Sequence, residues 1–490
     1  MRRTLCLLFL IASPLRAAPQ EALVLALSDA KTLDKDTVLY TRWFDLSHLT
    51  DEEQVLYARM LTLHTNLLSR EAVLKAPRAI AGVRLLAIDL RNYAIDVKVW
   101  EKLVDREPYY HQQKELVENI PVHANDQYGR QYIARYDQKK TIKSYPADHL
   151  SKSQLDEIYT LTNSQVPIVC GDWFLVMTSI EADRGGIGKG FGYYDFLGLK
   201  NRNDYFQIIG FDEKDKRSAL SEIGAVVMAH NSGVAQNDRM VVRRAAIDGW
   251  AWFTLDFFDS NKNERNPLAI LDRDKGLKHQ AERHFGRLPN GLPIMIACDG
   301  QGVLQETAPD KIGPDTTAKG QDTRIHPAKS CVSCHGTSNF LRDINDEVRI
   351  IYTVDKERGY NLLTSPINEE RLKLERIYLR DLRRYLENDR RDYAIAVRDC
   401  IGQDIKEASI EYREAYEKYT LNPVTVDTIA RGLGIPRNTF LEKFKAYRSN
   451  DKLTTHVLAP LSVGRPISRT NYESTYALLQ SVVRGRGDSK

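Results

Sequence analysis

The chain of 490 residues has few cysteines, few methionines and, beyond its first 18 residues, no long apolar segment. Six cysteines are too few for a disulfide scaffold in a protein of this length. No stretch after residue 18 approaches the roughly 18 apolar residues that a transmembrane helix needs. The formal net charge of +4 excludes a large basic field of the kind that attracts nucleic acid. We therefore expect neither a transmembrane segment in the processed chain nor a nucleic-acid partner.

The composition is otherwise that of an ordinary globular protein. Hydrophobic residues make up 42% of the chain and charged residues 28%, so sizeable cores can form. The length suggests about two to four domains. Changes in local character predict a signal peptide at 1–18, a mixed α/β region at 19–219, a β-rich region at 220–365 and a helical region at 366–490.

The first 18 residues have the pattern of an export signal. They begin with Met-Arg-Arg, continue with a short apolar run from Leu5 to Ala12, and end in small residues at Ala17 and Ala18. The apolar run is too short to span a bilayer, and a buried N-terminal helix is the alternative interpretation. The pattern predicts a protein that is periplasmic or otherwise exported.

Local patterns in the N-terminal region predict both helices and strands. Thr50 and Glu53 form a capping box before a helix of about 18 residues. The apolar run at 83–90 is typical of a buried strand. The segment at 166–180 is apolar almost throughout, and we interpret it as a strand or as buried chain entering the core.

The middle and the end of the chain differ in character. β-Branched and aromatic runs recur between residues 220 and 310, and the segment 288–306 predicts a hairpin whose turn is Asp299-Gly300. From Pro366 onward, leucines recur at helical spacing among charged residues. We therefore expect an α+β fold with a hairpin-rich middle, followed by a loop that carries the main motif, and a helical C-terminal region.

That motif is SCVSCHG, in which Cys331, Cys334 and His335 spell Cys-x-x-Cys-His. This is the attachment pattern for c-type haem. Two thiols add across the two vinyl groups of the porphyrin, and the two intervening residues give them the required reach. The adjacent imidazole then becomes an axial ligand of the iron. The motif predicts one covalent haem c held by Cys331 and Cys334, with His335 on the iron.

Three other interpretations of the cysteine pair fit less well. A redox Cys-x-x-Cys prefers the helix that follows a strand in a thioredoxin-like unit, and no such pattern surrounds this pair. A structural zinc site needs a second ligand pair at suitable spacing, which the sequence lacks. A simple disulfide leaves His335 without a role. Export favours haem, because haem c is attached outside the cytoplasm.

Several segments resemble one family, and the resemblance runs from about residue 50 to 485. They are DWFLVMTS at Asp172, SGVAQNDRM at Ser232, and LPNGLPIMI at Leu288 followed by SCVSCHG. The helical end, from YLRDLRRYLENDRRDYAIAV through ARGLGIPRNTFLEKF, adds to it. Together they resemble the large, mostly uncharacterised single-haem cytochrome c proteins of planctomycetes and similar bacteria. The resemblance implies covalent haem at the two motif cysteines and an axial role for the motif histidine, but little about the reaction.

The sixth position on the iron is left open by the sequence. Small soluble cytochromes c place a methionine ligand after the motif, but none of the six methionines here follows His335. Met228, His230 and Met240 lie in the β-rich region before the motif, so we rank them first as candidate ligands. A five-coordinate or water-ligated iron is the alternative.

We therefore predict electron transfer to or from an exported redox partner. The alternatives are a haem enzyme or a gas or peroxide sensor with an open iron position, and a binding module in which haem is incidental. Whether the chain is an enzyme stays open. The remaining cysteines, Cys170, Cys298 and Cys400, allow at most one intramolecular disulfide, and we interpret them as buried and inert thiols.

Overall fold

The computed structural model describes residues 19–110, 121–125, 131–135, 152–180, 191–212, 214, 223–227, 239–247, 249–256, 279–308, 323–337, 382–447 and 457–484. The expected signal peptide at 1–18 and two of the candidate iron ligands, Met228 and His230, lie outside these residues.

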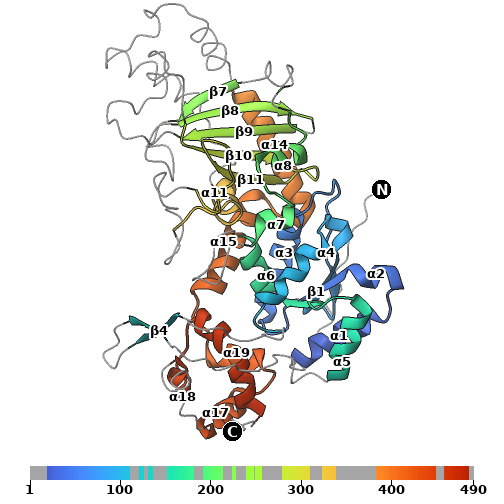
Figure 1. Ribbon diagram of the computed structural model, residues 1–490, viewed down its shortest axis with the longest axis vertical. Coiled ribbons are helices and arrows are strands. Elements are labelled where there is room, and N and C mark those ends of the chain that lie inside the picture. The colour runs from blue at the N-terminus through green and yellow to red at the C-terminus, as the bar shows by residue number, and fades with distance from the viewer. Residues whose placement is uncertain are drawn as a thin grey trace, which may run out of the picture.

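Figure 1 shows an elongated arrangement with a five-stranded sheet at one end and the C-terminal helices at the other. The N-terminal helices and a smaller sheet lie between these ends. Both helices and sheets are present, which confirms the α+β class. One buried core contains described residues from Ala22 to Val482 and so draws on the N-terminal, middle and C-terminal parts of the chain.

The N-terminal region contains a mixed four-stranded sheet of order β2-β3-β1-β6. In it, β1 pairs antiparallel with β3 and parallel with β6. A separate two-stranded pair is formed by β4 and β5. The elements are α1 (Pro19–Ala30), α2 (Lys35–Tyr40), β1 (Thr41–Asp45), α3 (Asp51–Leu67), β2 (Arg78–Ile80), β3 (Leu85–Asp89), η1 (Leu90–Tyr93), α4 (Val97–Glu101), η2 (Lys102–Asp105), β4 (Pro121–Asn125), β5 (Gln131–Arg135), α5 (Lys152–Thr162), β6 (Ile168–Cys170), α6 (Gly171–Thr178), α7 (Tyr193–Leu197) and α8 (Arg202–Ile208).

Two local predictions in this region are confirmed. Thr50 is the N-cap of α3, and Glu53 completes the capping box through bonds in both directions. The predicted strand at 83–90 is present as β3. The prediction for 166–180 was incomplete, because only β6 is a strand and the chain then continues as helix α6. Since α6 is buried nearly all round, its sequence has no polar face to distinguish helix from strand.

The described part of the middle region is rich in β-strands. Its five strands form an antiparallel sheet of order β11-β10-β9-β8-β7. They are β7 (Ile223–Val227), β8 (Arg239–Ala246), β9 (Gly249–Asp256), β10 (Ala281–Arg287) and β11 (Pro293–Asp299).

The hairpin of this sheet turns earlier than the sequence suggested. Strands β10 and β11 are joined through residues 288–292, where the Leu288 amide donates to the Leu292 carbonyl at 2.8 Å. Gly291 has a φ of 89° there, which favours glycine. The chain also reverses after Asp299, but only a single bridge, between Cys298 and Leu304, pairs its two sides. The predicted turn at Asp299-Gly300 is therefore present as a short reversal, in which the Gln305 amide also donates to the Ala297 carbonyl at 2.9 Å. The main hairpin of the sheet, which turns at 288–292, was not predicted.

The two faces of this sheet carry different side chains. Directly paired residues point to the same face, so Trp252 and Phe285 share one face while Leu255 and Glu282 share the other. Helix α14 (Arg383–Ile401) covers the first face, where Asp389 accepts a hydrogen bond from Trp252 Nε1 at 2.9 Å. Helix α8 covers the second face.

The described part of the C-terminal region is helical. Tyr57 of α3 donates a hydrogen bond to the Ala415 carbonyl at 2.7 Å, which joins these helices to the N-terminal region. Among the described residues no helix is both long and apolar enough to cross a membrane. The helices after α14 are α15 (Ile405–Leu421), α16 (Val426–Gly432), α17 (Arg437–Ala446), α18 (Ala459–Ser462) and α19 (Arg469–Arg484).

Candidate functional sites

The Cys-x-x-Cys-His residues lie in a helix, α11 (Lys329–Thr337), and not in the loop that we predicted. Local hydrogen bonds explain why the chain becomes helical here. The Ser330 amide donates to the His326 carbonyl at 3.0 Å, and the Ser330 hydroxyl accepts from the His326 amide at 3.1 Å. The Ser330 side chain thereby satisfies a backbone amide that precedes the helix and ties the incoming chain to its first turn.

Within α11 the three motif side chains share one face. Cys331, Cys334 and His335 are each half-buried, while Val332 and Ser333 between them are buried. Helical residues spaced by three and four positions lie one above another on the same side. The two thiols are therefore one helical turn apart, with the imidazole beside them. We call Cys331, Cys334 and His335 the haem-motif residues.

The opposite side of α11 is anchored to the rest of the protein. The Lys329 amide donates to the Ser179 carbonyl at 3.0 Å, directly after α6. The Ser409 hydroxyl of α15 donates to the Val332 carbonyl at 2.9 Å, and the Lys329 ammonium lies 5.1 Å from the centre of the Tyr416 ring. These contacts fix the orientation of the helix and so of its half-buried face.

An aromatic ring lies against the motif histidine. The ring centres of His335 and Phe285 are 4.5 Å apart, and Phe285 in turn stacks on Trp250, with an interplanar angle of 10°. Phe285 comes from β10, so the five-stranded sheet supplies an apolar neighbour to the imidazole. Sequence reasoning did not select Phe285, because nothing in the sequence connects it to a histidine 50 residues later.

Met240 does not share that environment. It pairs with Leu255, which pairs with Glu282, so Met240 lies on the face of the sheet that α8 covers. Phe285, the neighbour of His335, lies on the other face. This placement disfavours Met240 as a ligand of an iron bound to His335.

None of the five described cysteines forms a disulfide. Cys170 and Cys298 are buried and Cys400 is half-buried, so the interpretation of inert thiols holds best for the first two. Burial raises the pKa of the thiols of Cys298 and Cys400 to about 12, and it raises the pKa of Cys170 as well. These three thiols are therefore protonated at neutral pH in the absence of a metal.

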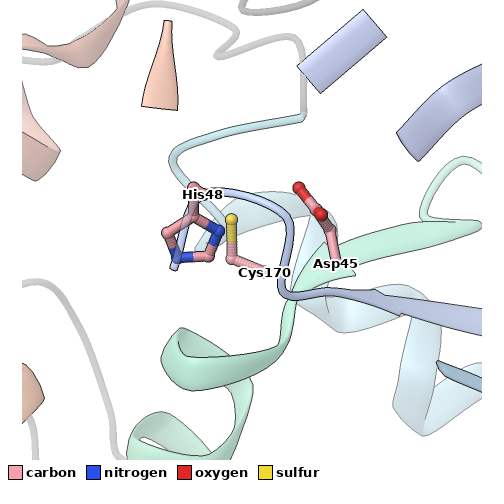
Figure 2. A group of neighbouring side chains, drawn as sticks. All are labelled: Asp45, His48 and Cys170. Atoms are coloured by element: carbon pink, nitrogen blue, oxygen red, sulfur yellow. The ribbon is translucent and has the colours of Figure 1, made fainter. Parts of the chain in front are cut away.

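Two other groups of side chains bring a carboxylate, an imidazole and a thiol together. The first consists of Asp45, His48 and Cys170, which we call the strand-end cluster (Figure 2). Its three ligand atoms all lie within 4.8 Å of one another. Sequence reasoning missed this cluster, because the contact depends on pairing two strands that are 125 positions apart in register, with Asp45 opposite Cys170.

Charged neighbours surround the strand-end cluster. His48 Nε2 lies 3.1 Å from an Asp172 oxygen. Burial opposes protonation of His48, but the carboxylates of Asp172 and Asp45 outweigh it and raise the pKa of the imidazole. Burial would likewise raise the pKa of Asp172, but His48 and Arg469 outweigh it and lower it. Burial also raises the pKa of Glu107 nearby to about 8.

The second group consists of Glu282, His284 and Cys298, which we call the sheet cluster. It is buried on the face of the sheet that α8 covers. Both Glu282 oxygens accept from Arg202 Nη1, at 2.9 and 2.7 Å, and the imidazoles of His279 and His284 lie 2.6 and 2.7 Å away. Burial opposes ionisation of Glu282, but these bonds together hold its pKa well below the ordinary value.

Comparison with known proteins gives no relative: no family model matches the chain, and no curated protein or solved structure is significantly similar to it. A functional assignment must therefore come from the residues and the geometry of these sites.

Proposed function

We propose that this chain is an exported c-type cytochrome that transfers electrons to or from an exported redox partner. In this proposal Cys331 and Cys334 hold one haem covalently and His335 is an axial ligand of its iron. The observation that carries it is the haem-motif face of α11, where two thiols one helical turn apart stand beside an imidazole.

The haem-motif residues have the chemistry that attachment needs. Each thiol gives its sulfur to one carbon of a vinyl group and its hydrogen to the other, so the two additions need no oxidant. Half-burial of Cys331 and Cys334 leaves both thiols partly accessible to a porphyrin. The bound iron would supply one-electron transfer between its ferric and ferrous states.

The surroundings of α11 would hold this arrangement in place. The bonds from Lys329 to Ser179 and from Ser409 to Val332 fix the buried side of the helix. Phe285 packs on His335 and covers part of the imidazole with an apolar ring. The imidazole is thereby kept in one orientation on the same helix face as the thiols.

A second candidate function is a haem enzyme, or a gas or peroxide sensor, with an open iron position. The placement of Met240 on the opposite face of the sheet from Phe285 favours it, because it disfavours one of the three ranked ligands. No methionine follows His335 in the sequence. An iron with a weak or absent sixth ligand binds exogenous ligands, whereas one with two strong ligands favours electron transfer.

Three measurements test these proposals, and the first concerns covalent attachment. Acidified-acetone extraction should leave the haem on the purified chain, and Cys331→Ala with Cys334→Ala should abolish covalent attachment. Cys298→Ala and Cys400→Ala are matched controls that should keep it. If all colour leaves the wild-type chain with the solvent, covalent attachment is disproved.

Visible spectra of the oxidised, reduced and CO-treated protein then separate the two functions. A low-spin iron that does not bind CO supports electron transfer. Rapid CO binding by the ferrous form supports the enzyme or sensor. Intact mass of the secreted protein tests export, because cleavage should remove about 17 or 18 residues.

A further inference from the structure

The strand-end cluster is built by the backbone and does not depend on long flexible side chains. Asp45 and Cys170 are register partners at the carboxyl ends of the parallel strands β1 and β6. His48 follows three residues after Asp45, in a turn closed by a bond from the Leu49 amide to the Leu46 carbonyl at 3.0 Å. Two strand ends and one tight turn therefore bring the three ligand atoms together.

The imidazole of His48 is oriented as a metal ligand would be. Its Nε2 is held by Asp172, while its Nδ1 is buried and has no hydrogen-bond partner among the described residues. Figure 2 shows Nδ1 on the side of the ring toward the Cys170 sulfur and Nε2 on the far side. Histidines that bind metals commonly donate their second N–H to a carboxylate, which fixes the tautomer and the ring.

The carboxylate of Asp45 is also held by hydrogen bonds, yet it keeps lone pairs that could bind a metal ion. One oxygen accepts from the Ser47 amide at 2.7 Å, and the other accepts from the Tyr110 hydroxyl. An ionised carboxylate has about four lone-pair sites, so each oxygen retains one. These two bonds orient Asp45 and leave it able to coordinate.

The charges in the cluster balance those of a divalent cation. A Cys170 thiolate and an ionised Asp45 together carry two negative charges, and both side chains are buried. The guanidinium of Arg469 acts electrostatically on Asp172, His48 and Cys170, and it also interacts with Glu473. Its charge is therefore opposed by carboxylates outside the ligand set.

We propose that Asp45, His48 and Cys170 bind a zinc ion, at a site separate from the haem-motif residues. A thiolate, an imidazole and a carboxylate are the three ligand types that zinc takes in proteins, and the soft thiolate selects against Mg²⁺ and Ca²⁺. Three protein ligands fill three positions of a tetrahedron and leave the fourth for water or another donor. The inference stands whether or not the chain carries haem.

The test is the zinc content and zinc environment of the full-length holoprotein. The protein is incubated with Zn²⁺, passed through gel filtration and analysed for metal by mass spectrometry. Wild type should retain one zinc per chain. Zinc-edge X-ray absorption should show one sulfur at about 2.3 Å and nitrogen or oxygen neighbours at about 2.0–2.2 Å. Cys170→Ser and His48→Gln should each reduce zinc affinity by about 100-fold or more. Each removes a ligand, so the loss should exceed the roughly 10- to 100-fold loss that follows mutation of a residue hydrogen-bonded to a ligand.

Matched controls separate this site from the other cysteines. Cys298→Ser removes the thiol of the sheet cluster and should leave zinc binding unchanged. Cys331→Ala with Cys334→Ala should also retain one zinc per chain, even though covalent haem is lost. If Cys170→Ser fails to fold, His48→Gln decides, because His48 lies in a turn with its side chain 12% exposed.

Four results would overturn the proposal. The first three are a wild-type protein that retains no zinc, zinc retained equally by wild type and His48→Gln, and an absorption spectrum without a sulfur neighbour. The fourth is zinc lost only in the haem-motif double variant, which would place the zinc at α11. Failure of covalent haem attachment, by contrast, concerns the proposed cytochrome function and leaves this site untouched.

Discussion

The strand-end cluster and the sheet cluster each bring a carboxylate, an imidazole and a thiol together inside the protein, but their lone pairs are used differently. In the sheet cluster one carboxylate, Glu282, serves both the imidazole and the guanidinium of Arg202. In the strand-end cluster Asp172 holds the imidazole of His48, and a second carboxylate, Asp45, remains available. Residue types alone therefore do not define a metal site, because free lone pairs and local charge decide which cluster can bind a cation.

The same comparison explains the difference in charge. Arg202 already supplies a fixed positive charge to Glu282, with side-chain exposures of 25% and 5%, so a cation there would have to displace an ion pair. A buried pair of this kind costs much desolvation, and its loss leaves an uncompensated charge. The sheet cluster is therefore a closed structural network, and the strand-end cluster is a candidate binding site.

The largest expected effect comes from breaking the sheet cluster. Arg202→Met should lower the free energy of unfolding by about 3 kcal/mol, because Glu282 would be left buried without its cation. Urea denaturation followed by circular dichroism measures this. Lys31→Met is the control, since Lys31 and Glu157 form an exposed pair whose loss should cost less than about 1 kcal/mol. Equal losses in the two variants would show that Arg202 does not neutralise a buried charge.

A third buried imidazole, that of His64, shows how an imidazole behaves without a neighbouring carboxylate in the described part of the chain. Among the described residues, the imidazole of His64 is hydrogen-bonded to the hydroxyls of Thr178, at 2.7 Å, and Tyr412, at 2.8 Å. Burial lowers its pKa to about 3. In the unfolded chain, the imidazole of His64 takes up a proton below its ordinary pKa of about 6.5, whereas in the folded protein it stays neutral down to about pH 3. The free energy of unfolding therefore falls as the pH is lowered from 6.5 toward 3. At pH 5 the loss is about 2 kcal/mol.

His64→Gln tests this, because glutamine does not titrate. The free energy of unfolding of the variant, measured from pH 7 to pH 5, should fall less steeply than that of wild type. Parallel pH profiles in that window would mean that His64 is not the group that titrates. His48 lies beside Asp172 and is unchanged in both proteins, so it does not affect the difference.

A smaller effect is expected from the partner of His48. Asp172→Asn should weaken zinc binding by about tenfold, because the amide holds the imidazole less firmly than a carboxylate does. Competition with a chelator of known affinity, read out by metal analysis, measures the change. The counterpart in the other cluster is Glu282→Gln, which should leave zinc affinity unchanged in the folded protein. Equal weakening by both would point to a general effect on stability.

The smallest effect concerns Met240, which lies on the face of the sheet that carries Glu282. Met240→Leu nearly conserves volume and should cost less than about 1.5 kcal/mol. The spectra of the oxidised and reduced protein and the CO affinity of the ferrous form should not change. A shift in the spectrum would indicate that Met240 is a ligand of the iron.

Features that depend on neighbouring residues could be predicted from the sequence. The capping box of Thr50 and Glu53, the strand at 83–90 and the Cys-x-x-Cys-His pattern are all local, and the structure contains the first two as expected. The α+β class and the helical C-terminal elements followed from periodicity in the same way. The helical state of α11 was missed, because its short sequence carries no apolar period.

Features that depend on distant pairing could not be predicted. The strand-end cluster requires β1 to pair with β6 in parallel, and an apolar run alone does not specify its partner strand. The placement of Met240 away from His335 depends on sheet register, since a shift by one residue would reverse its face. The contact between Phe285 and His335 likewise arises only after α11 packs near the sheet.

Helix α6 gives the two proposed sites a common mechanical element. It has Cys170 as its N-cap residue, and the carbonyl of Ser179 just beyond its end accepts from the first residue of α11. Its eight residues span about 12 Å. Gly171 at its start packs closely on Leu46 and Leu61, whose side chains would have to shift to admit a Cβ there. A rigid rod of this length would carry a displacement at one end to the other. By thermodynamic reciprocity, zinc would then shift the reduction potential of the iron by the same free energy by which the iron's oxidation state shifts zinc affinity.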